Sequence, residues 1–331
     1  MTMTRPLIAC LGAGRMGRGI AVAFAYAGHR VTLIDVKSRP DEQFAALQTE
    51  ALGEISKTLA SLSRFGLLAQ ADVETIFSRV SVVPGSKMAA ELTDAAIVFE
   101  GVPEVVELKR AVLSAASKCI GPAIVMASTT STILVNDLSS AVEHPHRFLN
   151  VHWLNPAYLI PLVEISPGTA TDPAVTARVK TLLEGIGKVP VVCAATPGFI
   201  VPRIQALAMN EAARMVEEGV ASAEDIDKAI RYGFGFRYAV LGLLEFIDWG
   251  GGDILYYASR YLEGALGSDR YRAPEVISQN MSAGRIGLRT GAGFLDYSGL
   301  DVDAYREQRL SELVNLLRHF GLSRPPVLER D

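Results

Sequence analysis

The amino-terminal part of the chain alternates short apolar runs with helical patterns. The run Leu7–Leu11 stops at a glycine turn, a helical pattern begins inside that turn, and a second apolar run starting at Val31 ends in Asp35. Nearly continuous apolar runs of this length are typical of strands that are buried on both faces. The order strand, turn, helix, strand predicts the beginning of a parallel α/β sheet.

The same kind of apolar run recurs further along the chain. Further strands are predicted at residues 80–83, 95–102, 123–128, 148–153, 162–166 and 189–193. Helical segments separate most of these runs, so we expect a Rossmann-type, doubly wound and mostly parallel sheet in residues 1–195. Residues 41–64 and a second stretch up to Phe77 predict an inserted helical hairpin. Two interpretations of the hairpin remain open: it clasps a ligand, or it covers the sheet edge.

Beyond residue 195 the pattern becomes helical. Residues 200–219 predict one long helix, Ser222 to Asp225 carries a capping-box pattern that begins the next, and residues 240–264 and 303–320 supply more helix. We expect a smaller, all-helical domain over residues 196–331 that covers the substrate cleft. Because long apolar helices need a partner, this domain is also the expected surface of a homodimer.

Composition agrees with a two-domain globular enzyme. The chain has 331 residues, of which 49% are hydrophobic and 21% charged, and a formal charge of −4. That charge gives no reason to expect nucleic-acid binding. We expect no membrane segment and no cationic leader, and the three cysteines lie in apolar runs, which favours a reducing compartment. The expected location is therefore the cytoplasm.

The glycine turn is the first candidate for chemistry. Gly12 permits a tight turn, Gly14 lets a pyrophosphate approach the backbone, and Gly17 lets the helix pack closely on the strand. Since a strand precedes the motif and a helix follows it, the pattern predicts a dinucleotide site rather than an ordinary turn.

The acid that ends the second strand bears on the choice of dinucleotide. Asp35 lies 18 residues beyond Gly17, where a carboxylate accepts hydrogen bonds from the hydroxyls of the adenine ribose and repels a 2′-phosphate. NAD is therefore the expected cofactor. The positively charged Lys37 and Arg39 follow closely, which makes the expected preference for NAD over NADP less strict.

Three predicted strand ends carry polar residues at the edge where a cofactor binds. These residues are Ser131, His152 and Glu164. Oxidation of a secondary alcohol needs a base for the hydroxyl proton, and an imidazole paired with a carboxylate suits that task. Each residue also has a structural interpretation: a buried histidine with satisfied hydrogen bonds for His152, and a loop or capping hydroxyl for Ser131.

These motifs together resemble the L-3-hydroxyacyl-CoA dehydrogenase family. The resemblance extends over nearly the whole chain, through the glycine turn, Pro103-Glu104 with Lys109, the Ser-Thr-Thr-Ser131 segment, His152-Trp-Leu-Asn155-Pro156, Leu-Val-Glu164, Pro197-Gly-Phe-Ile-Val and Glu218-Gly with Asp225-Ile-Asp227. It implies that His152 is the general base and acid, that Glu164 orients it, and that Ser131 donates to the substrate oxygen. It also implies further contacts with cofactor or substrate from Arg15, Met16, Glu104, Lys109 and Asn155. NAD is the cofactor that it implies, and no metal is expected.

Two departures from the family pattern concern the substrate. The family has an asparagine after Pro-Gly-Phe-Ile-Val, where this chain has Pro202, so Asn155 or Arg203 is expected to replace its amide unless the substrate differs. The hairpin that clasps CoA in the family is acidic here. The segment around Arg237 resembles the branch that contains L-gulonate 3-dehydrogenase, and Arg237 is either an anchor for a free carboxylate or a surface ion-pair residue.

The leading hypothesis is therefore NAD-dependent oxidation of a short-chain L-3-hydroxyacyl-CoA, as in 3-hydroxybutyryl-CoA dehydrogenases. A dehydrogenase of a free hydroxy acid, or of another carboxylated alcohol, is the first alternative. A non-catalytic, crystallin-like protein is the second, and the presence of both His152 and Glu164 weighs against it.

Overall fold

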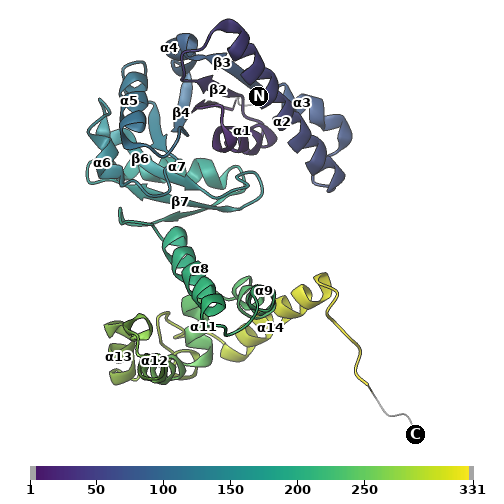
Figure 1. The fold of residues 1–331 in the computed structure, drawn as a ribbon, viewed down its shortest axis with the longest axis vertical. Helices are drawn as coiled ribbons and strands as arrows, with labels where there is room; N and C mark the ends of the chain where they lie inside the picture. Colours follow the sequence, from purple (N-terminus) through teal and green to yellow (C-terminus); the bar gives the residue numbers. More distant parts are fainter. Residues whose placement is uncertain (1–4, 328–331) are drawn as a thin grey trace. The chain divides into compact units, whose positions relative to one another are not determined.

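The computed structural model describes residues 5–327 of the chain, which divide into two compact units with the boundary between Ala208 and Met209 (Figure 1). This boundary falls inside helix α8, Val201–Glu217. The domain division expected at residues 195 and 196 stays a prediction.

The first unit contains an eight-stranded sheet with the strand order β3-β2-β1-β4-β5-β6-β7-β8 (Figure 1). Its strands are β1 Leu7–Leu11, β2 Val31–Asp35, β3 Val80–Pro84, β4 Ala95–Glu100, β5 Val125–Ser128, β6 Phe148–Trp153, β7 Leu162–Pro167 and β8 Val189–Val192. Neighbouring strands are parallel except for the pair β6 and β7. The predicted doubly wound, mostly parallel sheet is confirmed.

Helices cover both faces of this sheet. They are α1 Arg15–Tyr26, α2 Asp41–Arg64, α3 Val73–Phe77, α4 Met88–Leu92, α5 Val106–Ser117, α6 Val135–Ser139 and α7 Pro173–Glu184, with short 3-10 turns at Gln70–Asp72, Gly85–Lys87 and Pro145–Arg147. Alternate residues of β1 point to opposite faces, so Ile8 belongs to the apolar cluster that includes residues of α1, α2, α3 and α7, whereas Ala9 belongs to the cluster that includes residues of α4, α5 and α6. Both faces are therefore buried, which explains the continuous apolar runs of the strands.

The strand order places a ligand crevice at β1. The chain continues from β1 to β2 on one side and later returns to β4 on the other, so the connections after β1 and β4 lead to opposite sides of the sheet. Ligands of doubly wound sheets bind outside the carboxyl ends of the strands at this point. The glycine turn that follows β1 lies at that crevice.

Strand β7 differs from the sequence-based expectation that Glu164 would lie at the carboxyl end of a strand. It runs antiparallel to β6, and Glu164 lies in its first half, directly opposite His152. Because β7 is reversed, its amino-terminal half reaches the edge at which β6 ends. Glu164 therefore lies beside His152 near the edge at which β6 ends, although it is near the start of its own strand.

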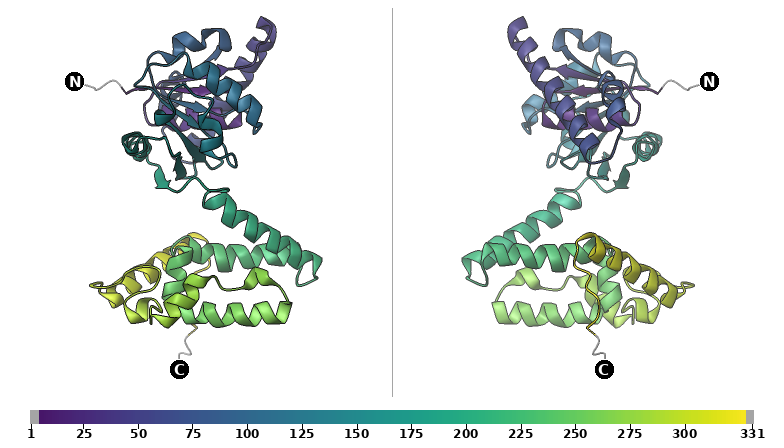
Figure 2. Two further views of the ribbon diagram at one scale, coloured as in Figure 1. Left: turned by 90° about the vertical axis from the view of Figure 1, so that its left-hand side faces the viewer. Right: turned by 90° about the vertical axis from the view of Figure 1, so that its right-hand side faces the viewer.

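The second unit is built from helices and two isolated bridges in its described residues (Figure 2). Besides the end of α8 it contains α9 Ala223–Ala229, a π-helix Ile230–Gly235, α10 Phe236–Tyr238, α11 Leu243–Gly250, α12 Gly252–Leu266, α13 Glu275–Ser282, α14 Val302–His319 and 3-10 turns at Asp269–Tyr271 and Leu288–Thr290. Gly251, at φ 106°, separates α11 from α12, as the glycine-rich joint indicated. Over residues 5–327, no helix has the length and apolarity that spanning a membrane requires.

Candidate active site

The glycine turn after β1 has the geometry that a dinucleotide phosphate requires. Gly12 has φ 110°, a conformation that favours glycine, and a Cβ on Gly17 would lie 2.2 Å from the Gly12 carbonyl oxygen. Gly14 precedes α1 with an extended backbone, and a Cβ there would meet no atom within 4 Å. The space beside Gly14 is therefore open, and the first N–H groups of a helix have no partner within it, so the residues present fit the pyrophosphate of NAD.

Other candidates from the same motif have different surroundings. Met16 packs against the core on the α1 face of the sheet, whereas Arg15 lines an open pocket. Asp35 is the last residue of β2 and is only 5% exposed, with its carboxylate paired to Arg39. The carboxylate thus ends the second strand as expected, but it already has a cationic partner.

His152 and Glu164 form a buried pair on neighbouring strands. The antiparallel register of β6 and β7 sets them opposite each other, and His152 Nδ1 lies 2.8 Å from Glu164 Oε2. A carboxylate accepts hydrogen bonds, so we infer that Nδ1 donates and carries the proton of the neutral imidazole. The lone pair on Nε2 is then free to accept a proton from another group.

The second oxygen of Glu164 is also held. Oε1 accepts hydrogen bonds from the backbone N–H groups of Ile200 and Val201 at the start of α8, at 2.9 and 2.8 Å. The preceding residue, Phe199, is 4% exposed, has φ 46°, and lies with its ring centroid 5.6 Å from that of His152. A bulky residue at positive φ is rare and marks functional sites. From the sequence, Phe199 was only part of the Pro197-Gly-Phe-Ile-Val motif and had no predicted role.

Ser131 lies on the other side of the imidazole. Its Oγ is 3.1 Å from His152 Nε2. The loop that carries Ser131 is fastened by Glu104, whose Oε1 accepts hydrogen bonds from the hydroxyls of Thr130 and Thr132 and from the backbone N–H groups of residues 131 and 132. Burial raises the pKa of Glu104, but Thr130, Lys109 and Thr132 outweigh it and hold the pKa below its ordinary value.

Lys109, for which a contact with cofactor or substrate stays a prediction, lies in a buried group of ionic contacts. It is 1% exposed, and its ammonium donates to both carboxylate oxygens of Glu100, at 2.9 and 3.2 Å, and to the Val102 carbonyl. Glu104 Oε2 lies 3.3 Å from the same ammonium. Acceptors within the protein thus surround the Lys109 ammonium. Its contact with Glu104 helps to hold the carboxylate that fastens the Ser131 loop. The buried acid Glu100 was not identified from the sequence.

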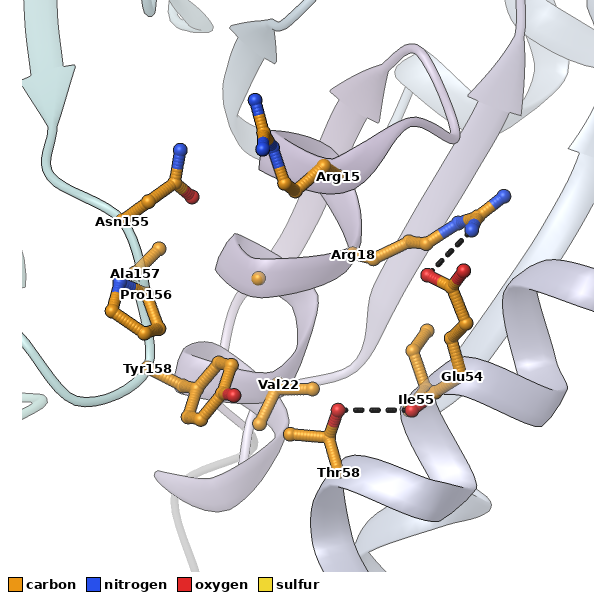
Figure 3. Close-up of a pocket in the computed structure, with 11 residues that line it drawn as sticks. Arg15, Arg18, Val22, Glu54, Ile55, Thr58, Asn155, Pro156, Ala157 and Tyr158 are labelled. Carbon is orange, nitrogen blue, oxygen red and sulfur yellow. Dashed lines mark hydrogen bonds and ion pairs between the residues drawn. The ribbon is translucent and has the colours of Figure 1, made fainter.

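Asn155 and Arg15 both line a pocket of about 340 Å³ between α1, α2 and the segment after β6 (Figure 3). Arg18 also lines it, but Figure 3 shows its guanidinium directed toward Glu54 of α2, at 2.6 Å. The same guanidinium lies 3.0 Å from Glu50, one turn earlier in α2. Two carboxylates thus neutralise Arg18. The hairpin accordingly contributes the carboxylate of Glu54 to the pocket, in agreement with its acidic composition.

The remaining candidates lie elsewhere. Pro202 is in the first turn of α8, where a proline is tolerated, and Arg203 is exposed in the same helix. Arg237 belongs to the second unit, where its Nε donates to the Gly233 carbonyl and its guanidinium lies 4.7 Å from the Phe246 ring centroid. The structure thus brings together His152, Glu164 and Ser131 within the first unit, and the roles of Arg203 and Arg237 stay predictions.

Comparison with known proteins gives the family. The family model described as 3-hydroxyacyl-CoA dehydrogenase, NAD binding domain, matches residues 7–196, and the model of the C-terminal domain matches residues 198–297. A 5-formyl-3-hydroxy-2-methylpyridine 4-carboxylate 5-dehydrogenase from Mesorhizobium japonicum is 30% identical over 94% of this chain and 97% of its own length. A 3-hydroxybutyryl-CoA dehydrogenase from Bradyrhizobium diazoefficiens is 31% identical over 88% and 95%.

Solved structures agree with this result. The crystal structure of a 3-hydroxyacyl-CoA dehydrogenase from Archaeoglobus fulgidus superimposes with a TM-score of 0.76 at 33% identity, covering 96% of this chain and all of the other. The matched domains and the named relatives identify an NAD-dependent oxidoreductase. The chain belongs to the 3-hydroxyacyl-CoA dehydrogenase family.

Proposed function

We propose that the protein oxidises a short-chain L-3-hydroxyacyl-CoA to the 3-oxoacyl-CoA with NAD. The observation that carries the chemistry is the double contact of His152, with Nδ1 held by Glu164 and Nε2 facing Ser131. A base with one nitrogen fixed and the other directed at a hydroxyl donor suits proton removal from a secondary alcohol. The kinship with 3-hydroxybutyryl-CoA dehydrogenases supports the substrate class and the short chain.

Each residue has a defined task in this proposal. A substrate hydroxyl between Ser131 and His152 accepts a hydrogen bond from Ser131 Oγ and donates its own proton to Nε2. The resulting imidazolium is stabilised by Glu164, whose other oxygen is held at the start of α8. When bound, NAD supplies the acceptor for the hydride that leaves the same carbon. In the reverse direction His152 returns the proton.

A free carboxylated hydroxy compound is the second candidate, and the pocket in Figure 3 favours it. Arg18 lines this pocket and is paired with Glu54, which also lines it, and with Glu50, so its charge attracts a polyphosphate tail only weakly. The relative from Mesorhizobium japonicum is named for a pyridine carboxylate and matches almost the full chain. Arg15, in the same pocket, is a candidate to hold a single carboxylate.

A substrate panel tests the two candidates. We expect NADH to form with L-3-hydroxybutyryl-CoA, with a kcat/KM at least about tenfold above that of free L-3-hydroxybutyrate, because binding energy from the CoA portion positions the reacting carbon. The D-enantiomer of the thioester is the matched control. Turnover of free hydroxy acids without turnover of the thioester would refute the acyl-CoA substrate and favour the free hydroxy compound. Turnover of neither would refute both candidate functions.

We further propose that the protein is a cytoplasmic homodimer formed through its helical unit. Ile254, Tyr257 and Tyr261 lie at helical spacing on α12 and are each more than 60% exposed. An apolar stripe of this kind supports a covered surface. Sedimentation velocity is expected to give about twice the 35.5 kDa mass of one chain, and Tyr261→Glu is expected to shift the protein toward a monomer. A monomer in the wild type would refute this proposal.

A further inference from the structure

A second pocket lies at the carboxyl ends of β2 and β3, beside Asp35. It has a volume of about 610 Å³, and apolar side chains that include Met88, Leu108 and Val112 line it together with the polar segment 37–39. Ligands of doubly wound sheets bind at this edge, and the acid at the end of β2 marks the ribose end of the dinucleotide. The apolar part of the pocket therefore suits the adenine ring, and the segment 37–39 lies where the ribose is expected.

The carboxylate that ordinarily selects an unphosphorylated ribose is already engaged. Arg39 Nε lies 2.6 Å from Asp35 Oδ2, and the backbone N–H of Lys37 donates to Oδ1 at 3.4 Å. Both side chains are largely withdrawn from solvent, with 7% of Asp35 and 27% of Arg39 exposed. An ion pair formed in this setting removes most of the repulsion that Asp35 alone would exert on a phosphate.

The charge balance at the ribose end is consequently positive. Asp35 contributes −1, while Lys37 and Arg39 contribute +1 each, so the segment carries a net +1. Only one of the guanidinium nitrogens of Arg39 is used by Asp35, and its Nη groups offer further N–H donors in a plane that matches phosphate geometry. Ser38 adds a hydroxyl donor on the rim of the same pocket.

We propose that this pocket accepts the 2′-phosphate of NADP(H) in addition to the free ribose of NAD(H), and that Arg39 is the residue that permits it. Arg39 neutralises Asp35 and presents its remaining N–H groups to the phosphate. When the 2′-position carries a hydroxyl instead, Asp35 accepts its hydrogen bond. The proposal concerns the dinucleotide pocket alone, so it goes beyond the proposed substrate and does not depend on it.

Binding of nucleotide fragments tests the proposal without any turnover. Isothermal titration calorimetry compares 2′,5′-ADP with 5′-AMP on the whole protein. We expect the wild type to bind 2′,5′-ADP at least as tightly as 5′-AMP, with an affinity for 2′,5′-ADP that falls as salt is raised. Arg39→Ala is expected to weaken 2′,5′-ADP by at least about tenfold while leaving 5′-AMP bound as tightly or more tightly, because Asp35 is released for the ribose.

Arg64→Ala is the matched control, since Arg64 is an exposed arginine at the end of α2 and bonds only to Ser61 among the side chains described. Once a substrate is known, Arg39→Ala should lower kcat/KM with NADP and leave kcat/KM with NAD unchanged or higher. Wild-type protein that binds 5′-AMP but not 2′,5′-ADP would overturn the proposal. An equal loss of both ligands in Arg39→Ala would also overturn it, because Arg39 would then only pack against adenine. Failure of every hydroxylated substrate would refute the proposed function and leave this result intact.

Discussion

Replacing His152 by alanine is expected to lower kcat by about 10²–10⁴-fold, the usual contribution of a positioned general acid or base. The variant lacks the acceptor for the hydroxyl proton, whereas the glycine turn that holds the cofactor is untouched. Stopped-flow or steady-state formation of NADH, measured with the substrate that the wild type oxidises, gives kcat. Titration of NADH fluorescence is expected to give an unchanged Kd, which separates lost chemistry from lost cofactor binding.

Two further variants sharpen this test. His146→Ala removes an exposed histidine from the loop before β6 and is expected to leave kcat unchanged. Glu164→Gln removes the negative charge that stabilises the imidazolium and replaces one acceptor oxygen by an NH₂ group, so either His152 Nδ1 or the backbone donors of Ile200 and Val201 lose their acceptor. The kcat is therefore expected to fall with folding retained. A His152→Ala protein with near wild-type kcat would exclude His152 as the base.

The sheet was predictable because its strands are buried on both faces and therefore form apolar runs. The long helix was predicted at 41–64 and spans Asp41–Arg64. The reversal of β7 was not predicted, although the chain contains a signal for it. The connection between Trp153 and Leu162 is too short for the crossover that a parallel pair needs. That reversal sets Glu164 opposite His152.

Other parts of the site depend on contacts between residues distant in sequence. Arg18 and Glu54, or Glu104 and Thr132, are paired by packing of helices and loops that no local pattern specifies. Burial of Lys109 against Glu100 was equally inaccessible, because a charged residue on a helix is ordinarily exposed. Residue types at the site were thus predictable from motifs, whereas their partners required the fold.

Gly17→Ala is expected to destabilise the first unit by about 3 kcal/mol, the upper end of the usual cost of overpacking. Helix propensity alone would favour alanine by about 1 kcal/mol, since Gly17 lies within α1. The clash decides the outcome, because the new Cβ would lie 2.2 Å from the backbone oxygen of Gly12, which no rotamer change can relieve. Thermal unfolding should show a lower Tm, and NADH binding should weaken because the turn must open.

Two other glycines separate this effect from a general intolerance of alanine. Gly53 lies inside α2 with no atom within 4 Å of an added Cβ, so Gly53→Ala should be neutral or stabilising by up to about 1 kcal/mol. Gly14 has an extended backbone that alanine adopts freely, so Gly14→Ala should keep the wild-type Tm. Its methyl group would nevertheless occupy the space that the pyrophosphate approaches, so the NADH Kd should rise by about tenfold or more. Wild-type NADH affinity in Gly14→Ala would mean that the dinucleotide does not approach this turn.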